Sequence, residues 1–380
     1  MRSLATLLAC CALLAGCNGT PVRDLSGAAD TRHLDEAQQR RWHEAQELDR
    51  ALRNRGVLLD DPEAQAYVQS VMDRLFPEFR GSIHVHVARS SALNAYALPN
   101  GSIYINLGLL ARMRNEAQLA MVLGHEATHF IEQHSLRQRD SADAIAVAGI
   151  ATTVLTGIPF SGQLLALGAM SGYSQDLERA ADQGGFRRLI RAGYDPQQAP
   201  EVFRLMREEV DALDIDRPFL YSSHPRLSER IETLGRLAAQ PDTPAGGRSG
   251  REDFLEHVGR LRGRLLAQYL EEQDYKRLIL ILEDPKRRAD YPPESDYYLG
   301  EAYRLRNQEG DQAKAVAAWE RCLANRPDFA PVHRALGLHA MRLAQRERAI
   351  EHLRRYLELA PRARDRAYIQ RYLQRLQDTP

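Results

Sequence analysis

The five residues 125–129, which read His-Glu-Ala-Thr-His, constrain this chain more than any other part of its sequence. Residues 116–133 contain no proline and carry apolar side chains at helical spacing, which predicts a single helix. His125 and His129 are four positions apart on that helix and lie on one face, where both rings can bind the same metal ion. Glu126 then lies beside the ion and can take a proton from an attacking water molecule. The pattern is typical of zinc hydrolases.

A match of five residues does not establish a metal site by itself. With 12 histidines in 380 residues, chance produces such a match in roughly a few per cent of chains, and the alternative is an amphipathic helix with surface histidines. A catalytic zinc site also needs a third protein ligand. A second predicted helix, within residues 173–196, offers the carboxylates of Glu178 and Asp182. They are four positions apart, so one can bind the metal while the other accepts the N–H of a ligand histidine.

These two helices resemble those of the HtpX/BepA-type gluzincin metallopeptidases. In that family an HExxH helix precedes an ExxxD helix and an Ala-Gly-Tyr-Asp-Pro segment, which is found here at residues 192–196. Residues 94–110 are similar to the edge strand of the family's cleft, and residues 222–231 are similar to its His-Pro…Arg-Ile element. The chain departs from the family at Ala180, where a second glutamate is usual, and at Asn100, where glycine is usual. Neither departure removes a ligand.

The resemblance implies a fold and a role for each site residue. The expected fold class is α+β, with a mostly helical zincin-type domain, a small sheet and an active-site edge strand, followed by an all-α repeat domain. His125, His129 and Glu178 are expected to hold one Zn²⁺ per chain. Glu126 is expected to act as general base and then to protonate the leaving amine. Asp182 is expected to orient a ligand imidazole.

The same resemblance implies how a substrate binds. An extended segment is expected to add to the edge strand, which selects unfolded chains more than particular sequences. The expected substrates are misassembled outer-membrane proteins. The residues predicted to form this substrate edge are Asn94, Ala95, Tyr96, Ile103 and Tyr104.

His224 is a further candidate, because in BepA-like relatives the histidine of the His-Pro element approaches the zinc. Pro225 restricts His224 to extended conformations, which leaves its ring free to project from the chain. As a fourth protein ligand it would displace the catalytic water and hold the enzyme latent. The alternatives are a histidine that hydrogen-bonds a transition-state oxygen, or one that caps the following helix.

The N-terminal segment predicts export. Residues 1–17 have one early positive charge, a short apolar stretch and small residues before Cys17, which is typical of a signal peptide. Residues 14–17 resemble a bacterial lipobox, which implies cleavage before Cys17 and its lipidation, and Asn18 favours the outer membrane by analogy with Gram-negative sorting. The alternative is an uncleaved anchor, although the apolar run is short for a membrane span. Only Cys17 and Cys322 would remain, so we expect no intrachain disulfide.

Residues 144–175 contain no charged residue and are long enough to cross a bilayer of about 30 Å. They are, however, rich in alanine, glycine, threonine and serine and are interrupted by Pro159. A single span would also place His129 and Glu178 on opposite sides of the membrane. We therefore predict two helices packed around Pro159, with contact to a membrane surface as the alternative.

Three other histidines are predicted to lie outside the metal site. Residues 57–76 read as a helix and residues 82–88 alternate as a strand, with His84 and His86 on one face. These two rings could chelate a metal, but we favour the solvent face of a half-buried strand, because the site already has its ligands. His134 is nine residues from His125, which on a continuous helix is the opposite face.

The composition changes after residue 239. Residues 240–252 are rich in proline, glycine and serine and resemble a linker. Beyond them an alanine, a leucine and a proline recur after 34 residues, the period of tetratricopeptide repeats. The recurring pairs are Ala315 and Ala349, Leu323 and Leu357, and Pro327 and Pro361. Two repeats are fewer than stability usually requires, so residues 254–282 are expected to complete the stack.

Four segments are therefore expected: a signal peptide over 1–16, a zinc metallopeptidase domain over 17–239, a linker over 240–252 and repeats over 253–378. In the peptidase domain, a helical segment is expected to extend to about residue 56. Equal numbers of basic and acidic residues, 51 each, give no argument for nucleic acid binding. We expect a lipid-anchored periplasmic endopeptidase whose repeats recruit substrates or outer-membrane assembly machinery. The alternative is a chaperone-like assembly factor or scaffold with rare or latent proteolysis.

Overall fold

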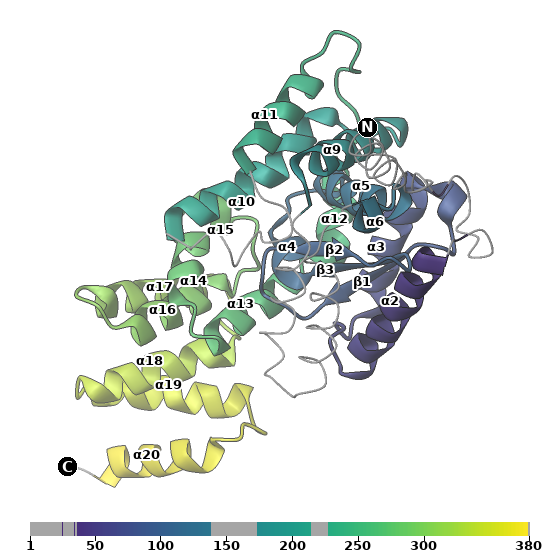
Figure 1. Cartoon of the computed structure of the whole chain (residues 1–380). Coiled ribbons are helices and arrows are strands. Elements are labelled where there is room, and N and C mark those ends of the chain that lie inside the picture. Colours follow the sequence, from purple (N-terminus) through teal and green to yellow (C-terminus); the bar gives the residue numbers. More distant parts are fainter. Residues whose placement is uncertain (1–24, 26–33, 35, 138–172, 214–226, 379–380) are drawn as a thin grey trace, which may run out of the picture.

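The computed structural model describes residues 25, 34, 36–137, 173–213 and 227–378. Within these residues, helices surround one small three-stranded sheet and continue into an all-helical C-terminal region (Figure 1), which confirms the predicted α+β fold class. No helix in these ranges has the length and apolar character needed to cross a membrane. Most of the uncharged run predicted to form two helices falls in residues 138–172, which lie outside the described parts of the chain.

The sheet consists of β1 (His84–Ala88), β2 (Ala95–Ala97) and β3 (Ser102–Asn106) in the order β1-β3-β2. β3 runs parallel to β1 and antiparallel to β2, and all five of its residues are buried. The predicted edge role was therefore wrong for Ile103 and Tyr104, because β3 already has a neighbouring strand on both sides. Of the predicted substrate edge, only β2 lies at an edge of the sheet.

The opposite edge, β1, is covered by side-chain amides of α3 (Pro62–Leu75). Gln69 accepts a hydrogen bond from the Val85 amide (2.8 Å), and Gln65 accepts one from the Val87 amide (3.1 Å). The helix predicted over 57–76 begins only at Pro62, because the side chain of Asp61 caps it and accepts from the Ala64 amide. The residues before it pair with the end of β1 instead.

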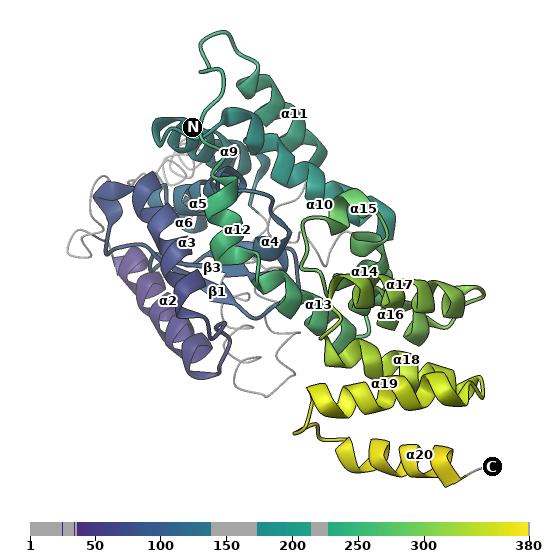
Figure 2. The same ribbon diagram turned by 180° about the vertical axis from the view of Figure 1, so that it is seen from behind.

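The helix α2 (Glu36–Asn54) covers the sheet face that carries Tyr96 and Tyr104 (Figure 2). Asp49 of this helix accepts a hydrogen bond from the Tyr104 hydroxyl (2.8 Å) and lies 3.7 Å from the His86 ring. The prediction of a solvent-facing pair holds for His84, which is exposed, but His86 lies largely buried under α2.

The metal helix is α5 (Glu116–Ile131), and it packs along α9 (Gln175–Arg191). Three glycines permit this contact. A Cβ added at Gly185 would lie 2.8 Å from the backbone nitrogen of His125, and one added at Gly124 would lie 3.0 Å from the Cα of Gly185. One added at Gly184 would lie 2.5 Å from the Thr128 side chain. The two helix backbones are therefore in direct contact beside the histidine pair.

The C-terminal residues as far as Leu336 share a continuous hydrophobic core with the N-terminal domain, whereas the last helices have a separate cluster that includes Leu353 and Ile369. The segment predicted as a linker is bound to that domain, because the Arg248 amide donates to the Gly193 carbonyl (3.0 Å) and the Ala117 amide donates to the Ser249 carbonyl (3.0 Å). Arg262 is fully buried and donates to the Met113 carbonyl (2.9 Å). Two helices lie between α9 and this segment, α10 (Ala199–Leu213) and α11 (Leu227–Ala238). Four helices follow, α12 (Arg251–Val258), α13 (Leu261–Glu271), α14 (Tyr275–Leu282) and α15 (Pro285–Arg288).

The remaining helices form two antiparallel pairs and one last helix, and this region fits tetratricopeptide-like repeats. α16 (Ser295–Arg306) pairs with α17 (Asp311–Asn325), and α18 (Ala330–Arg342) pairs with α19 (Arg346–Leu359) before α20 (Arg366–Asp378). A Cβ added at Gly300 would lie 2.4 Å from Trp319, and one added at Gly337 would lie 2.7 Å from Leu353. The same small residue thus permits close packing in both pairs, although these two glycines are 37 residues apart and not 34.

We expect Gly185→Ala to lower the free energy of unfolding by about 1–3 kcal/mol, because its new methyl group would meet the backbone of α5. Gly235→Ala on α11 is the matched control, since a Cβ there has a single neighbour, at 4.0 Å, and alanine favours the helix by about 0.5–1 kcal/mol. Chemical denaturation monitored by circular dichroism measures the free energy of unfolding of both variants. Equal stability of the Gly185→Ala protein and the wild type would contradict the close contact.

Candidate metal centre

The N-terminal end of α5 is fixed by a buried carboxylate. Glu116 has no exposed surface, and it accepts hydrogen bonds from the hydroxyls of Tyr67 (2.6 Å) and Tyr194 (2.7 Å) and from Arg74. The helix is capped by Asn115, whose side chain accepts from the Gln118 amide (3.0 Å). These contacts join α5 to α3 and to the segment after α9, so the helix enters the core in one fixed orientation.

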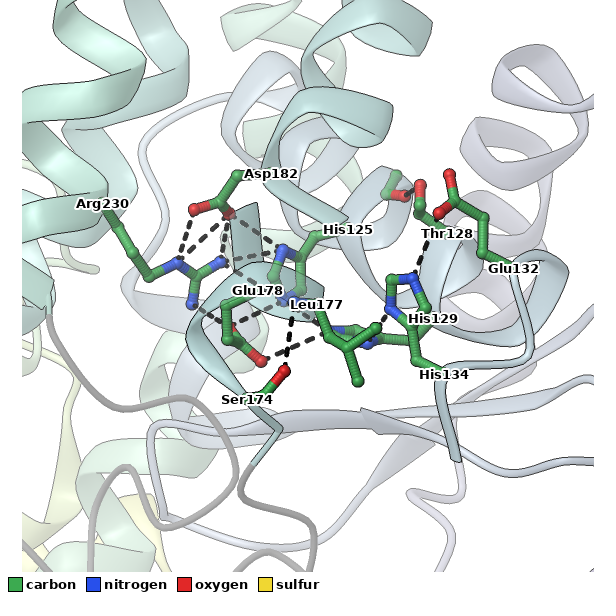
Figure 3. A network of polar contacts seen from close by, with 11 residues as sticks. His125, Thr128, His129, Glu132, His134, Ser174, Leu177, Glu178, Asp182 and Arg230 are labelled. Carbon is green, nitrogen blue, oxygen red and sulfur yellow. Dashed lines mark hydrogen bonds and ion pairs between the residues drawn. The ribbon is translucent and has the colours of Figure 1, made fainter. Parts of the chain in front are cut away.

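His125, His129 and Glu178 meet where α5 and α9 touch (Figure 3). The Nε2 atoms of the two histidines are 3.0 Å apart, and the Glu178 carboxylate lies 3.6 Å from the first and 3.4 Å from the second. All three side chains are buried. Two imidazoles and one carboxylate are the protein ligands of a common class of catalytic zinc site, so the donor set fits this ion. In the described parts of the chain, no other group of three such side chains comes together.

Asp182 holds the ring of His125 from the side opposite the candidate ligand atoms. Its Oδ1 lies 2.9 Å from Nδ1 of His125, which leaves Nε2 directed at the other two ligands. Burial would raise the pKa of Asp182, but the charge of Arg230 and the hydrogen bond with His125 outweigh it and lower that pKa. Burial, followed by the charge of Arg230, lowers the pKa of His125 and favours the neutral ring that a metal requires.

Arg230 of α11 completes this side of the site, and the sequence analysis assigned it no role. Its guanidinium donates to Asp182 Oδ1 (2.6 Å) and Oδ2 (3.1 Å), lies 3.7 Å from Glu178 and stacks over the ring of Phe203 at 4.0 Å. Burial lowers its pKa, but the carboxylates of Asp182, Glu178 and Glu126 outweigh burial, so the pKa of Arg230 is raised. The only sequence signal was its position in the His-Pro…Arg-Ile element.

Glu126 is buried on α5 next to His125 in sequence. It does not belong to the group of three side chains whose ligand atoms gather at one point. Glu126 therefore adjoins the candidate ligand His125 in the chain and is not one of the three grouped side chains. This position suits a group that exchanges protons with a reacting molecule.

His134 lies closer to the site than the sequence analysis predicted. The prediction was based on a continuous helix. Instead, α5 ends at Ile131, and Gln133 has a left-handed backbone conformation with a φ of 52°. The Nδ1 atom of His134 lies 2.8 Å from the Nδ1 atom of His129. The ring of Tyr173 stacks on His129, with ring centres 3.9 Å apart and an angle of 14° between the planes.

Tyr173 lines two hollows. One is bordered by Ala97 at the end of β2, by His129 and by the indole of Trp42. The other is bordered by Glu178 and Arg230. Each hollow therefore has a candidate metal ligand in its lining, His129 in the first and Glu178 in the second. Two other predicted positions, Cys17 and His224, lie outside the residues that the structure describes.

Residues 59–238 match the family described as Peptidase family M48. Over 206 residues the chain is 26% identical to a beta-barrel assembly-enhancing protease of Escherichia coli, in a match that covers 50% of this chain and 42% of that protein. It is 30% identical over 154 residues to the mitochondrial metalloendopeptidase OMA1 of Schizosaccharomyces pombe, covering 40% of this chain and 45% of the relative. The chain thus spans less than half the length of each of these relatives.

We expect the purified protein to contain about one zinc per chain and Glu178→Ala to lose it, because two imidazoles alone leave the site under-coordinated. Asp176→Ala is the matched control, since this carboxylate lies in the same turn of α9 but is 92% exposed. Elemental analysis after dialysis measures the zinc content. Full zinc content in the Glu178→Ala protein would remove this residue from the ligand set.

Proposed function

Because residues 59–238 form a domain of peptidase family M48, we propose that the protein is a zinc-dependent metalloendopeptidase. The observation that carries this proposal is the buried meeting of His125, His129 and Glu178 beside Glu126. Zinc at these three ligands would supply Lewis acidity for the hydrolysis of a peptide bond. The name of the Schizosaccharomyces pombe relative, a metalloendopeptidase, supports the same reaction class.

The remaining roles follow from the contacts of each side chain. Glu126 takes a proton from the attacking water and passes it to the leaving amine. Asp182 accepts from the Nδ1 side of His125, which fixes the tautomer whose Nε2 lone pair faces the site. Arg230 offsets the negative charge of the surrounding carboxylates and keeps Asp182 ionised. Each of these roles is assigned to a residue that the structure describes.

The edge of β2 that has no partner strand among the described residues is the proposed binding surface for substrate. In the antiparallel ladder, the Asn94 carbonyl accepts from the Asn106 amide (3.0 Å), and the Leu98 amide donates to the Ser102 carbonyl (2.8 Å). The alternation of the ladder therefore turns the backbone groups of Ala95 and Ala97 away from β3. Since the β1 edge is covered by glutamines, β2 is the edge at which an extended segment can add. Recognition of backbone favours unfolded segments.

The proposed substrates are misassembled proteins of the bacterial envelope. The name of the Escherichia coli relative, a beta-barrel assembly-enhancing protease, supports outer-membrane proteins as the class. The helical repeats would recruit substrates or assembly machinery, because stacked helix pairs form extended binding surfaces. A lipid on Cys17 would hold the enzyme at the periplasmic face of the outer membrane. A scaffold or chaperone that rarely cleaves is the second candidate function, since the repeats alone could perform it.

Glu126→Gln separates these two functions. We expect it to lower cleavage of an unfolded outer-membrane protein by at least about a hundredfold, because the amide cannot accept the proton. The zinc content is expected to stay at the wild-type value, because Glu126 is not a ligand. A time course of substrate loss on gels, together with elemental analysis, measures both quantities.

The same variant tests the function in cells. In a deletion strain, the peptidase proposal predicts that Glu126→Gln fails to restore envelope integrity at wild-type protein levels. Full restoration by this variant would instead establish the scaffold function and refute the need for proteolysis.

A further inference from the structure

The second candidate ligand, His129, has its own chain of hydrogen-bonding groups. Its Nε2 atom faces His125 and Glu178, whereas its Nδ1 atom lies 2.8 Å from Nδ1 of His134. The Nε2 atom of His134 in turn lies 3.1 Å from a carboxylate oxygen of Glu132. The three side chains thus lead from the site to a carboxylate that is 24% exposed (Figure 3).

The positions of the protons in this chain follow from metal binding. A histidine that gives its Nε2 lone pair to a metal carries its proton on Nδ1. His129 must therefore donate to Nδ1 of His134, which leaves His134 with its own proton on Nε2. That proton points to a carboxylate oxygen of Glu132, which accepts it at 3.1 Å. Only one arrangement of protons satisfies all three groups.

His134 is held in place for this contact. It has no exposed surface, and it follows a backbone reversal at Gln133, whose side chain accepts a hydrogen bond from Gln38 of α2 (2.7 Å). Tyr173 stacks on the ring of His129 and limits its rotation. The two candidate ligand histidines are thus oriented differently, one directly by the Asp182 carboxylate and the other by an imidazole that lies between it and a carboxylate.

We propose that His134 and Glu132 are positioning residues that fix the tautomer and orientation of His129 for metal binding. The inference rests on the proposed function, since it assumes that His129 is a zinc ligand. Hydrogen-bond partners of ligand histidines typically contribute ten- to hundredfold to metal affinity or activity. His134 acts through His129 and does not touch the metal itself.

The test compares zinc affinity in three full-length variants by competition with a chromophoric chelator. His134→Phe keeps a ring but removes the acceptor, so we expect zinc binding to weaken by about ten- to hundredfold. His134→Asn places an amide oxygen near the former Nδ1 atom and is expected to recover much of that loss. His352→Phe is the matched control, because His352 is a buried repeat residue whose Nδ1 lies 3.1 Å from Nδ1 of His333. It is expected to leave zinc affinity unchanged.

A spectroscopic measurement separates positioning from general destabilisation. In the cobalt-substituted protein, the visible absorption bands report ligand geometry, so His134→Phe should shift them and His352→Phe should not. If His134→Phe does not fold, Glu132→Leu breaks the chain at its partly exposed end and should weaken zinc binding more than Glu132→Gln, whose amide oxygen still accepts from His134.

The possible outcomes distinguish a failure of the proposed function from a failure of the positioning role. A wild-type protein that binds no zinc refutes the proposed function. Tight zinc binding by the wild type, with the same affinity and the same cobalt spectrum in a folded His134→Phe protein, refutes the positioning role alone. Equal zinc affinities of Glu132→Leu and the wild type refute it where His134→Phe is unfolded.

Discussion

The direct backbone contact between α5 and α9 is the constraint on which the rest of the site depends. Gly124 and Gly185 let the helices approach until a single Cβ would collide with the facing backbone. At that separation the carboxylates of Glu178 and Asp182 reach opposite sides of the His125 ring. Helices with larger residues at the contact would place the same side chains several ångströms apart. The site thus exists because two adjacent residues in α9 lack side chains.

The charges of the site explain why this arrangement favours a cation. Glu126, Glu178, Asp182 and Arg230 are all buried. Three carboxyl groups thus face one guanidinium, and burying acidic groups in excess of basic ones is costly. A divalent cation at the histidine pair balances this excess. Arg230 offsets part of the charge through Asp182 and Glu178, and its guanidinium also lies 3.3 Å from Nε2 of His125.

The spacing of residues along the sequence predicted those features that lie within a single helix or repeat. Four-residue spacing identified His125 with His129 and Glu178 with Asp182, and the spacing of 34 residues identified the repeats. Neither signal indicates which helices touch, and the contact glycines in α9 carry no periodic pattern. The resemblance to a known family, and not the spacing, singled out Glu178 as the ligand.

Tertiary contacts determined what the sequence analysis missed. His134 was predicted to lie outside the metal site and is not among the three grouped side chains, but its contact with His129 was missed because the helix ends at Ile131 and no glycine or proline marks the turn at Gln133. Arg230 reaches the site from α11, far from both helices in sequence. Strand order is also a three-dimensional property: β3 pairs on both sides, so Ile103 and Tyr104 lie inside the sheet. The segment rich in proline and glycine was predicted to be a linker, and the hydrogen bonds of Arg248 and Ser249 to the N-terminal domain could not be foreseen from its composition.

The most direct test of the central claim is an anomalous difference map from crystals of the zinc-loaded protein, measured at the zinc absorption edge. We predict one strong peak, at about 2.0–2.2 Å from Nε2 of His125, from Nε2 of His129 and from a carboxylate oxygen of Glu178. A peak that lies elsewhere, for example at the His333 and His352 pair of the repeats, would contradict it, as would the absence of a peak at the three residues.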